Sequence, residues 1–99
     1  MAPIPTFRLS EFGATFATRG RGKELREEFL SRMAGEDAVE VDFEGVTNVS
    51  YSFADEFFGV LMTSAGTDVP TARLVNIKPA VARVVRDAIG RRRNEPVTC

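Results

Sequence analysis

The sequence predicts a single α/β domain with a mixed, mostly parallel sheet and helices packed against it. Apolar and polar residues alternate in two short runs, 39–44 and 72–77, as in strands with one buried face. Apolar residues recur at helical spacing in three longer runs, 23–33, 52–65 and 79–90. Alternating strands and helices favour right-handed crossovers and parallel pairing, and 99 residues are enough for one core.

The first half of the chain supplies a strand, an ambiguous segment and a helix. Residues 4–9 predict the first strand, and Pro3 and Pro5 favour a sheet edge because proline cannot donate to a ladder. Residues 12–17 fit either a connector or a short second strand. A glycine-rich turn then leads into the helix expected at 23–33, whose apolar residues recur every fourth position.

The second half of the chain adds two further strand–helix units. The helix expected at 52–65 has so wide an apolar face that we expect deep burial, and Gly66 is its natural stop. The strand at 72–77 is followed by Pro79, which suits a first helical position. Gly90 and the arginines after it are expected to end the last helix.

The domain is expected to occupy residues 1–94, with a frayed tail at 95–99. The single cysteine, Cys99, cannot form an internal disulfide, which favours a reducing compartment. The sequence has no apolar run of about 18 residues and does not begin like a signal peptide. We therefore expect a cytoplasmic protein without a membrane partner.

The absence of histidine narrows the chemistry that this chain could perform. Histidine is the commonest general base and the commonest metal ligand, and none is present. Nucleophilic sites that pair serine or cysteine with histidine are excluded, as are zinc sites built from histidine and cysteine. We expect no catalytic residues, no metal and no cofactor, although acid–base chemistry by carboxylates remains open.

Charge is unevenly distributed although the net charge is only −1. Residues 36–56 contain seven acidic and no basic residues, whereas residues 73–93 contain seven basic residues and one acidic residue. Such separation favours steering of a charged partner, while the net charge does not favour nucleic acid. The Arg91–Arg93 run could contact nucleic acid, but it lacks interleaved aromatic residues and we interpret it as a solvated helix end.

A serine-rich turn before the second helix holds the main candidate site residues. Ser50, Tyr51 and Ser52 lie where unpaired backbone N–H groups and the helix dipole favour negative charge. Ser52 to Asp55 fits a capping box, with Ser52 as the N-cap. Ser52 is therefore either only a cap or also a modifiable hydroxyl on a partner surface, and the two roles are compatible.

A second motif alternates three cations, Arg19, Arg21 and Lys23, with two glycines just before the first expected helix. Such a turn could cradle an anion, but it does not match a P-loop or a dinucleotide-binding fingerprint. The alternative is a flexible, solvated turn. Because parallel strands deliver their loops to the same sheet edge, we expect Arg19 to lie near Ser52 or Asp42.

The sequence around these motifs resembles a known family. Residues 41–55 resemble the strand–loop–helix centre of STAS domains, the fold of anti-sigma-factor antagonists, and residues 74–81 resemble the later strand and proline-led helix of that fold. The whole pattern is most similar to a STAS-like branch whose function is not established and whose members tend to occur with histidine-kinase-like ATPases. The resemblance implies a bacterial, non-enzymatic regulatory module that binds a protein partner, such as a GHKL-type ATPase or serine kinase.

The resemblance also implies a phosphorylation site. In the antagonists the strand ends in Asp-Ser-Ser-Gly, and a partner kinase phosphorylates the second serine. Ser50, Tyr51, Ser52 and Phe53 occupy these four positions here, so the modified serine corresponds to Ser52. The implied partner surface comprises Ser50, Tyr51, Ser52 and Asp55, together with the exposed face of the following helix.

The main alternative is a small anion-binding or nucleotide-binding module. It would use the basic turn that contains Arg19, Arg21 and Lys23. A homodimer also remains open at this stage.

Overall fold

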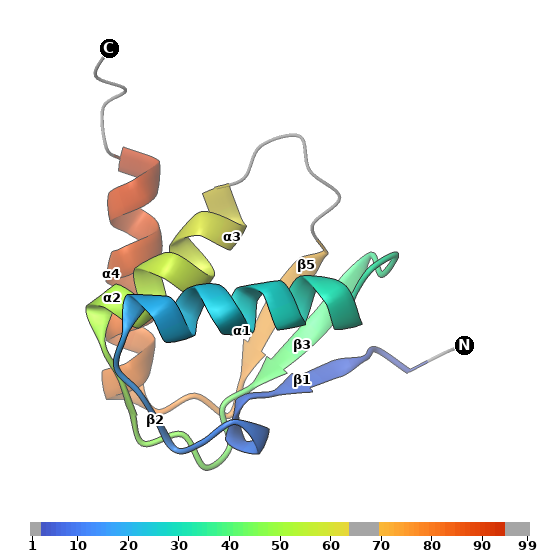
Figure 1. The fold of residues 1–99 in the computed structure, drawn as a ribbon, viewed down its shortest axis with the longest axis horizontal. Helices are drawn as coiled ribbons and strands as arrows, with labels where there is room; N and C mark the ends of the chain where they lie inside the picture. Colours follow the sequence, from blue (N-terminus) through green and yellow to red (C-terminus); the bar gives the residue numbers. More distant parts are fainter. Residues whose placement is uncertain (1–2, 64–69, 95–99) are drawn as a thin grey trace.

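Three parallel strands form the main sheet of the computed structural model, which describes residues 3–63 and 70–94 (Figure 1). Their spatial order is β1 (Thr6–Arg8), β3 (Ala38–Asp42) and β5 (Thr71–Val75). Two further strands, β2 (Thr15–Phe16) and β4 (Asn48–Val49), form a second parallel pair. The helical segments are η1 (Leu9–Glu11), α1 (Arg19–Arg32), α2 (Tyr51–Ala54), η2 (Asp55–Gly59), α3 (Val60–Thr63) and α4 (Pro79–Asn94). The α/β architecture expected from the sequence is confirmed.

The main sheet has one apolar and one polar face. Phe7 of β1 lies opposite Val41 of β3, and Val41 lies opposite Leu74 of β5. The rings of Phe29 on α1 and Phe57 on η2 contact Phe7, so this face carries the helices. The other face is mostly polar and exposed, as the alternating sequence of a half-buried strand requires.

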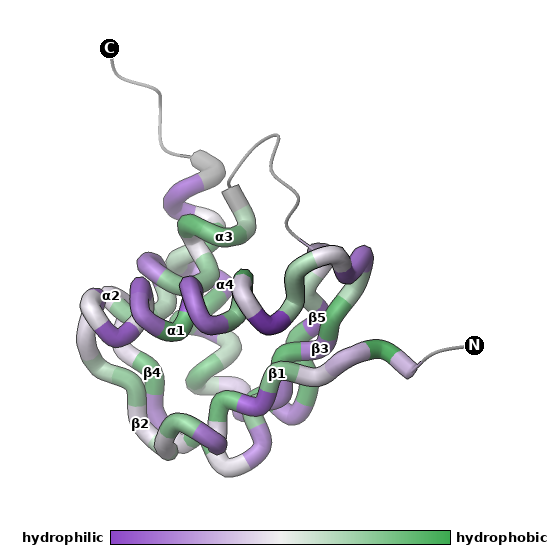
Figure 2. The backbone as a smooth tube through the Cα atoms, turned by 45° about the vertical axis from the view of Figure 1, so that its right-hand side comes forward, coloured by the Kyte–Doolittle hydropathy of each residue, from purple (hydrophilic) through white to green (hydrophobic). Residues whose placement is uncertain are grey.

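Aromatic side chains dominate the core. Seven phenylalanines are no more than 1% exposed. Phe57 is central among them, because its ring centroid lies 4.5 Å from that of Phe58 and 5.8 Å from those of Phe29 and Phe53. Figure 2 shows that α3 is hydrophobic, whereas α1 carries many hydrophilic positions. The expected deep burial of the second helix is confirmed.

The second helix is interrupted by a π-helical turn and covered on two sides. In η2 the backbone N–H of Val60 donates to the carbonyl of Asp55, five residues earlier. The run α2–η2–α3 packs against α1 on one side and α4 on the other. The expectation that this helix offers an exposed face to a partner is therefore wrong, since its buried residues point in nearly every direction.

Helix α1 begins earlier than the sequence pattern indicated. Thr18 is the N-cap, and its hydroxyl accepts a hydrogen bond from the backbone N–H of Arg21 at 3.1 Å. Gly20 and Gly22 consequently lie inside the helix rather than in a flexible turn before it. At Gly22 a Cβ would approach the carbonyl oxygen of Phe53 to 2.9 Å, so glycine permits the close contact between α1 and α2.

The structure also extends α4 beyond its predicted end at Gly90 and resolves the two alternatives for residues 12–17. Helix α4 continues through Gly90 to Asn94, because tertiary contacts beyond the glycine stabilise its last turn. The segment 12–17 contains a short strand, β2. The expected helix stop at Gly66 and the expected tail at 95–99 lie outside the described residues.

Replacement of Phe57 by alanine should destabilise the domain by about 3–5 kcal/mol, because a ring that is 0% exposed leaves a cavity between the sheet and α1. Urea denaturation followed by circular dichroism measures the change. Leu30→Ala is the control, since Leu30 is 36% exposed and should cost far less. A Phe57→Ala protein as stable as the parent would contradict this packing.

The two glycines at the start of α1 should respond oppositely to alanine. Nothing lies within 4 Å of a Cβ at Gly20, so Gly20→Ala should gain up to about 1 kcal/mol from helix propensity. Gly22→Ala should instead lower the melting temperature, because its methyl group would press on the backbone of α2 and η2. Equal shifts in the two thermal melts would argue against the close helix approach.

Candidate functional site

Two helices begin side by side at the end of the small parallel sheet. β2 leads into α1 and β4 leads into α2, and the backbone N–H of Ser50 donates to the carbonyl of Phe16 at 2.8 Å. The hydroxyl of Ser50 donates to the carbonyl of Ala17, also at 2.8 Å. The expectation that the loops entering both helices meet at one edge is confirmed.

Ser50, and not Ser52, caps the second helix. The Ser50 hydroxyl oxygen accepts a hydrogen bond from the backbone N–H of Phe53 at 3.0 Å, and the Ser50 backbone is extended, as an N-cap requires. Ser52 is already helical and half-buried. The capping box expected from Ser52 to Asp55 is therefore wrong, because two serines two residues apart compete for the same position and the cross-strand bond to Ala17 selects Ser50.

Asp55 is a buried carboxylate held by two arginines from different helices. Arg92 on α4 donates through Nε to Oδ1 at 2.7 Å and through Nη2 to Oδ2 at 3.0 Å. Arg19 on α1 donates to Oδ2 at 2.7 Å. The hydrogen bonds from Arg92, followed by that from Arg19, outweigh the effect of burial and lower the pKa of Asp55 to about 2.

Glu56 extends this ion-pair cluster toward α1. Arg26 donates to its Oε2 at 2.6 Å and also to its backbone carbonyl, and Arg19 lies 3.3 Å from Oε1. The bond from Arg26 is the main reason that the pKa of Glu56 is lowered, with Arg19 adding to it. Arg19 therefore bridges two adjacent carboxylates on the central helix.

A glycine makes room for the ion pair between Asp55 and Arg92. A Cβ at Gly59 would lie 2.9 Å from Oδ1 of Asp55 and 3.1 Å from Cδ of Arg92. Any larger residue would push the Arg92 side chain away from the carboxylate. The π-helical turn thus combines a carboxylate with the space that its partner needs.

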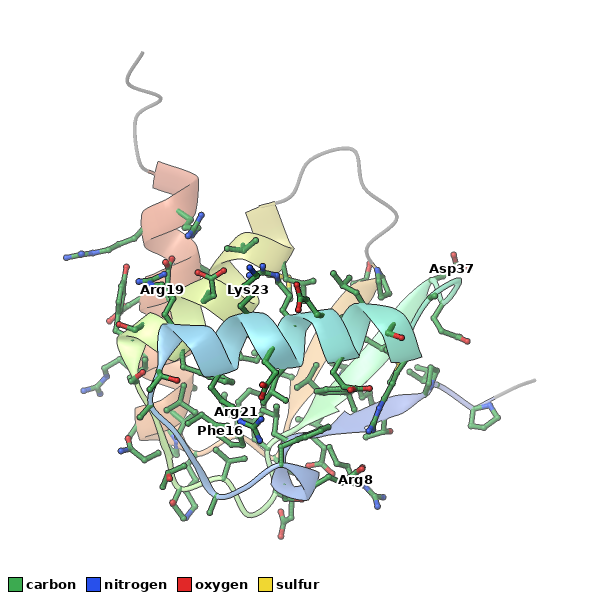
Figure 3. The ribbon with its side chains drawn as sticks, in the orientation of Figure 1. Arg8, Phe16, Arg19, Arg21, Lys23 and Asp37 are labelled. Carbon is green, nitrogen blue, oxygen red and sulfur yellow. The ribbon has the colours of Figure 1, made fainter. Side chains whose placement is uncertain are left out.

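The three cations expected to form an anion cradle do not point to a common place. Figure 3 shows Arg19 and Lys23 on one side of α1 and Arg21 on the opposite side. Arg21 donates to the carbonyl of Phe12 at 3.0 Å and pairs with Glu24. Arg19 and Arg21 thus already donate hydrogen bonds within the domain, whereas Lys23 is exposed and forms no ion pair among the described residues.

Asp42 lies apart from Arg19. Its carboxylate accepts hydrogen bonds from the side-chain amide of Asn76 at 3.0 Å and from the backbone N–H of Glu44 at 2.9 Å. These bonds, with that from Asn76 the stronger influence, lower the pKa of Asp42. The suggested contact between Arg19 and Asp42 is wrong. Asp42 is the last residue of β3 in the main sheet, whereas Arg19 begins α1 after β2, which pairs with β4 in the other sheet.

Tyr51 stands at the edge of a hollow between α2 and α4. Its ring is exposed, and the guanidinium of Arg91 lies 5.5 Å from its centroid, a cation–π distance. The hollow has a volume of about 1040 Å³ and is lined by Tyr51, Asp55, Arg86, Asp87, Gly90, Arg91 and Arg92. Of the four residues expected to form a partner surface, Tyr51 is the exposed one.

The arginines that complete this site were not predicted from the sequence, although helical spacing indicates two of them. Val81, Val85 and Ala88 mark the buried stripe of α4, and Arg92 is its next member. Arg26 follows Arg19 by seven residues, so both lie on one face of α1. The interpretation of residues 91–93 as a solvated helix end is wrong for Arg92, which donates to Asp55.

Two absences apply to residues 3–63 and 70–94. Within these ranges no group of three or more cysteine, aspartate or glutamate side chains could hold a metal ion. The helices described there are also too short or too polar to cross a membrane.

A family model described as a STAS-like domain of unknown function matches residues 21–78, more than half of the chain. The chain therefore belongs to this STAS-like family, as its sequence resemblance indicated. Membership supports, at a coarse level, a regulatory or interaction module. No curated protein and no solved structure matched the chain. The matched range contains α2 and the two carboxylates of the ion-pair cluster, Asp55 and Glu56. The arginines of α4 lie beyond the matched range.

Replacement of Asp55 by asparagine should cost about 2 kcal/mol at neutral pH, the value of a pKa lowered to about 2. Because the folded state lowers this pKa, the stabilisation is complete above about pH 4 and is lost as the pH falls toward 2. Denaturation midpoints of both proteins should therefore converge in acid. Asp87→Asn, an exposed carboxylate on α4, is the matched control. A difference that persists unchanged at low pH would contradict the assignment.

Proposed function

We propose that this domain is a non-enzymatic regulatory module whose binding to a protein partner is switched by phosphorylation of Ser52. The proposed partner is a GHKL-type ATPase or serine kinase in the cytoplasm. The observation that carries the proposal is the position of Ser52 in the first turn of α2, next to the exposed ring of Tyr51. A modification at this position changes the surface that a partner would contact.

The ion-pair cluster supplies a physical reason for a switch. Ser52 precedes Asp55 and Glu56 by three and four residues, which places the three side chains on one face of a helix. A phosphate carries about −1.5 to −2 charges at pH 7 and would be repelled by both carboxylates. It would also compete with them for Arg19, which donates to both in the unmodified domain.

The state of the carboxylates supports the non-enzymatic part of the proposal. Asp55 is bound by two guanidinium groups, and its pKa of about 2 makes it a poor general base at neutral pH. Glu56 is held in the same way by Arg26 and Arg19. These groups stabilise the packing of helices and are not free to move protons.

Calorimetry distinguishes this proposal from an anion-binding or nucleotide-binding module. A plain interaction module should give no heat with ATP or inorganic phosphate at the basic start of α1. A nucleotide-binding module would give a heat that disappears when Lys23, which unlike Arg19 and Arg21 forms no ion pair among the described residues, is replaced by glutamine. The pairing of Arg19 and Arg21 inside the domain favours the first outcome.

Ser52→Asp should fold normally and lose the partner, whereas Ser52→Ala should keep both stability and binding, because the helix cap is Ser50. Circular dichroism measures folding, and affinity capture from a lysate of the source organism, with mass spectrometry, measures binding. A GHKL-type ATPase should be retained by the parent and by Ser52→Ala but not by Ser52→Asp.

Ser31→Asp is the matched control for this experiment, because Ser31 is an exposed serine on α1 and receives the same charge. It should retain the partner. Capture of the same ATPase by Ser52→Asp would remove the switch, and loss of the ATPase with Ser31→Asp would show that added charge alone weakens binding.

A further inference from the structure

The hollow between α2 and α4 is rich in arginine, and two of its arginines are not neutralised. Arg92 is paired with Asp55, as described above. Among the residues that the structure describes, no carboxylate lies within ion-pair distance of Arg86 or Arg91. Arg91 instead lies against the ring of Tyr51. Two guanidinium groups and an exposed aromatic ring therefore share one concave surface.

These groups match the chemistry of a peptide-binding surface. A guanidinium binds a carboxylate through two parallel N–H···O bonds, and tyrosine and arginine are among the residues that contribute most to binding at protein interfaces. The hollow opens widely to solvent and has a volume of about 1040 Å³, at the upper limit for a pocket that encloses a small molecule. An extended segment of several residues suits this shape better than a single ion does.

We propose that this hollow is the docking site for an acidic segment of a partner protein, a proposal that rests on the interaction function above. Arg86 and Arg91 bind carboxylates of the segment, and the Tyr51 ring packs against its side chains. Asp87 lines the same hollow and repels carboxylates placed beside it, which restricts the segment to one register. The Arg92–Asp55 ion pair positions the last turn of α4, and with it Arg91, beside Tyr51.

Docking of an acidic segment gives the Ser52 switch a direction. Ser52 does not line the hollow, but it precedes Asp55, which does, by three residues. Positions three residues apart on a helix are neighbours, so a phosphate on Ser52 brings negative charge close to the hollow. That charge repels the carboxylates of the segment and competes for the guanidinium groups that would bind them. Phosphorylation consequently weakens docking rather than strengthening it.

The chain contains its own reporter for this hollow. Tyr51 is the single tyrosine and there is no tryptophan, so tyrosine fluorescence reports on this one position. We expect an oligoglutamate peptide to produce a saturable change in Tyr51 emission that weakens as salt is added. An oligolysine peptide, inorganic phosphate and ATP are titrated separately at the same ionic strength, and calorimetry provides a second readout.

The decisive variant is Arg86→Gln combined with Arg91→Gln. It should weaken oligoglutamate binding by about tenfold or more while the thermal melt changes little, because both side chains are exposed and only the surface contact between Arg91 and Tyr51 is lost. Arg83→Gln is the matched control for each single variant, Arg86→Gln and Arg91→Gln: it removes one positive charge from an exposed position of α4 that does not line the hollow. This control should bind oligoglutamate nearly as well as the parent.

Three results would overturn the docking site. They are no binding of oligoglutamate, equal binding of oligolysine, and an equal loss with Arg83→Gln. Phosphate or ATP could also bind through the same arginines at least as tightly as oligoglutamate does. That result would show that the hollow binds a small anion and not an acidic segment.

The same assays separate this site from the switch. If Ser52→Asp leaves oligoglutamate binding unchanged, the proposed switch at Ser52 is wrong and the proposed docking site stands. If the double arginine variant still captures the ATPase, the proposed docking site is wrong and the proposed function stands.

Discussion

The carboxylate of Asp55 is a charge placed inside a layer of helices, and the arrangement of that layer depends on its neutralisation. Asp55 is only 8% exposed, and an unpaired charge at this position would be strongly destabilising. Arg19 from α1 and Arg92 from α4 approach it from opposite sides of the central helix. Gly22 and Gly59 allow the close approaches that bring these arginines within reach.

This ion pair also determines which charges remain for function. Arg19, Arg26 and Arg92 are engaged by Asp55 and Glu56, so these cations serve the fold. Within the described part of the chain, only Lys23 of the three cations at the start of α1 is left without an ion pair, whereas the unpaired Arg86 and Arg91 on α4 lie together in one hollow. The same engagement makes the cluster sensitive to a new negative group on Ser52, because Arg19 can serve only a limited number of acceptors.

The proposed switch and the proposed docking site use one short stretch of chain for two purposes. Ser50 joins β2 to the start of α2, which makes this turn rigid, whereas Tyr51 and Ser52 follow at once as surface and half-buried positions. A rigid turn presents the Tyr51 ring in a defined orientation and lowers the entropy lost on binding. A modification in such a turn alters the surface without requiring the core to unfold.

The sequence by itself determined the parallel α/β architecture and the deep burial of the second helix, because alternation and helical spacing are local consequences of which faces must avoid water. The resemblance of residues 41–55 and 74–81 to known domains indicated the family. It placed Ser50, Tyr51 and Ser52 at one helix start but could not decide which serine caps it, since the bond to Ala17 joins segments 33 residues apart. Only the tertiary structure could decide that the guanidinium of Arg92 reaches Asp55 and that Gly22 and Gly90 continue helices. Glycine ends a helix by local preference, and contacts with distant residues outweigh that preference here.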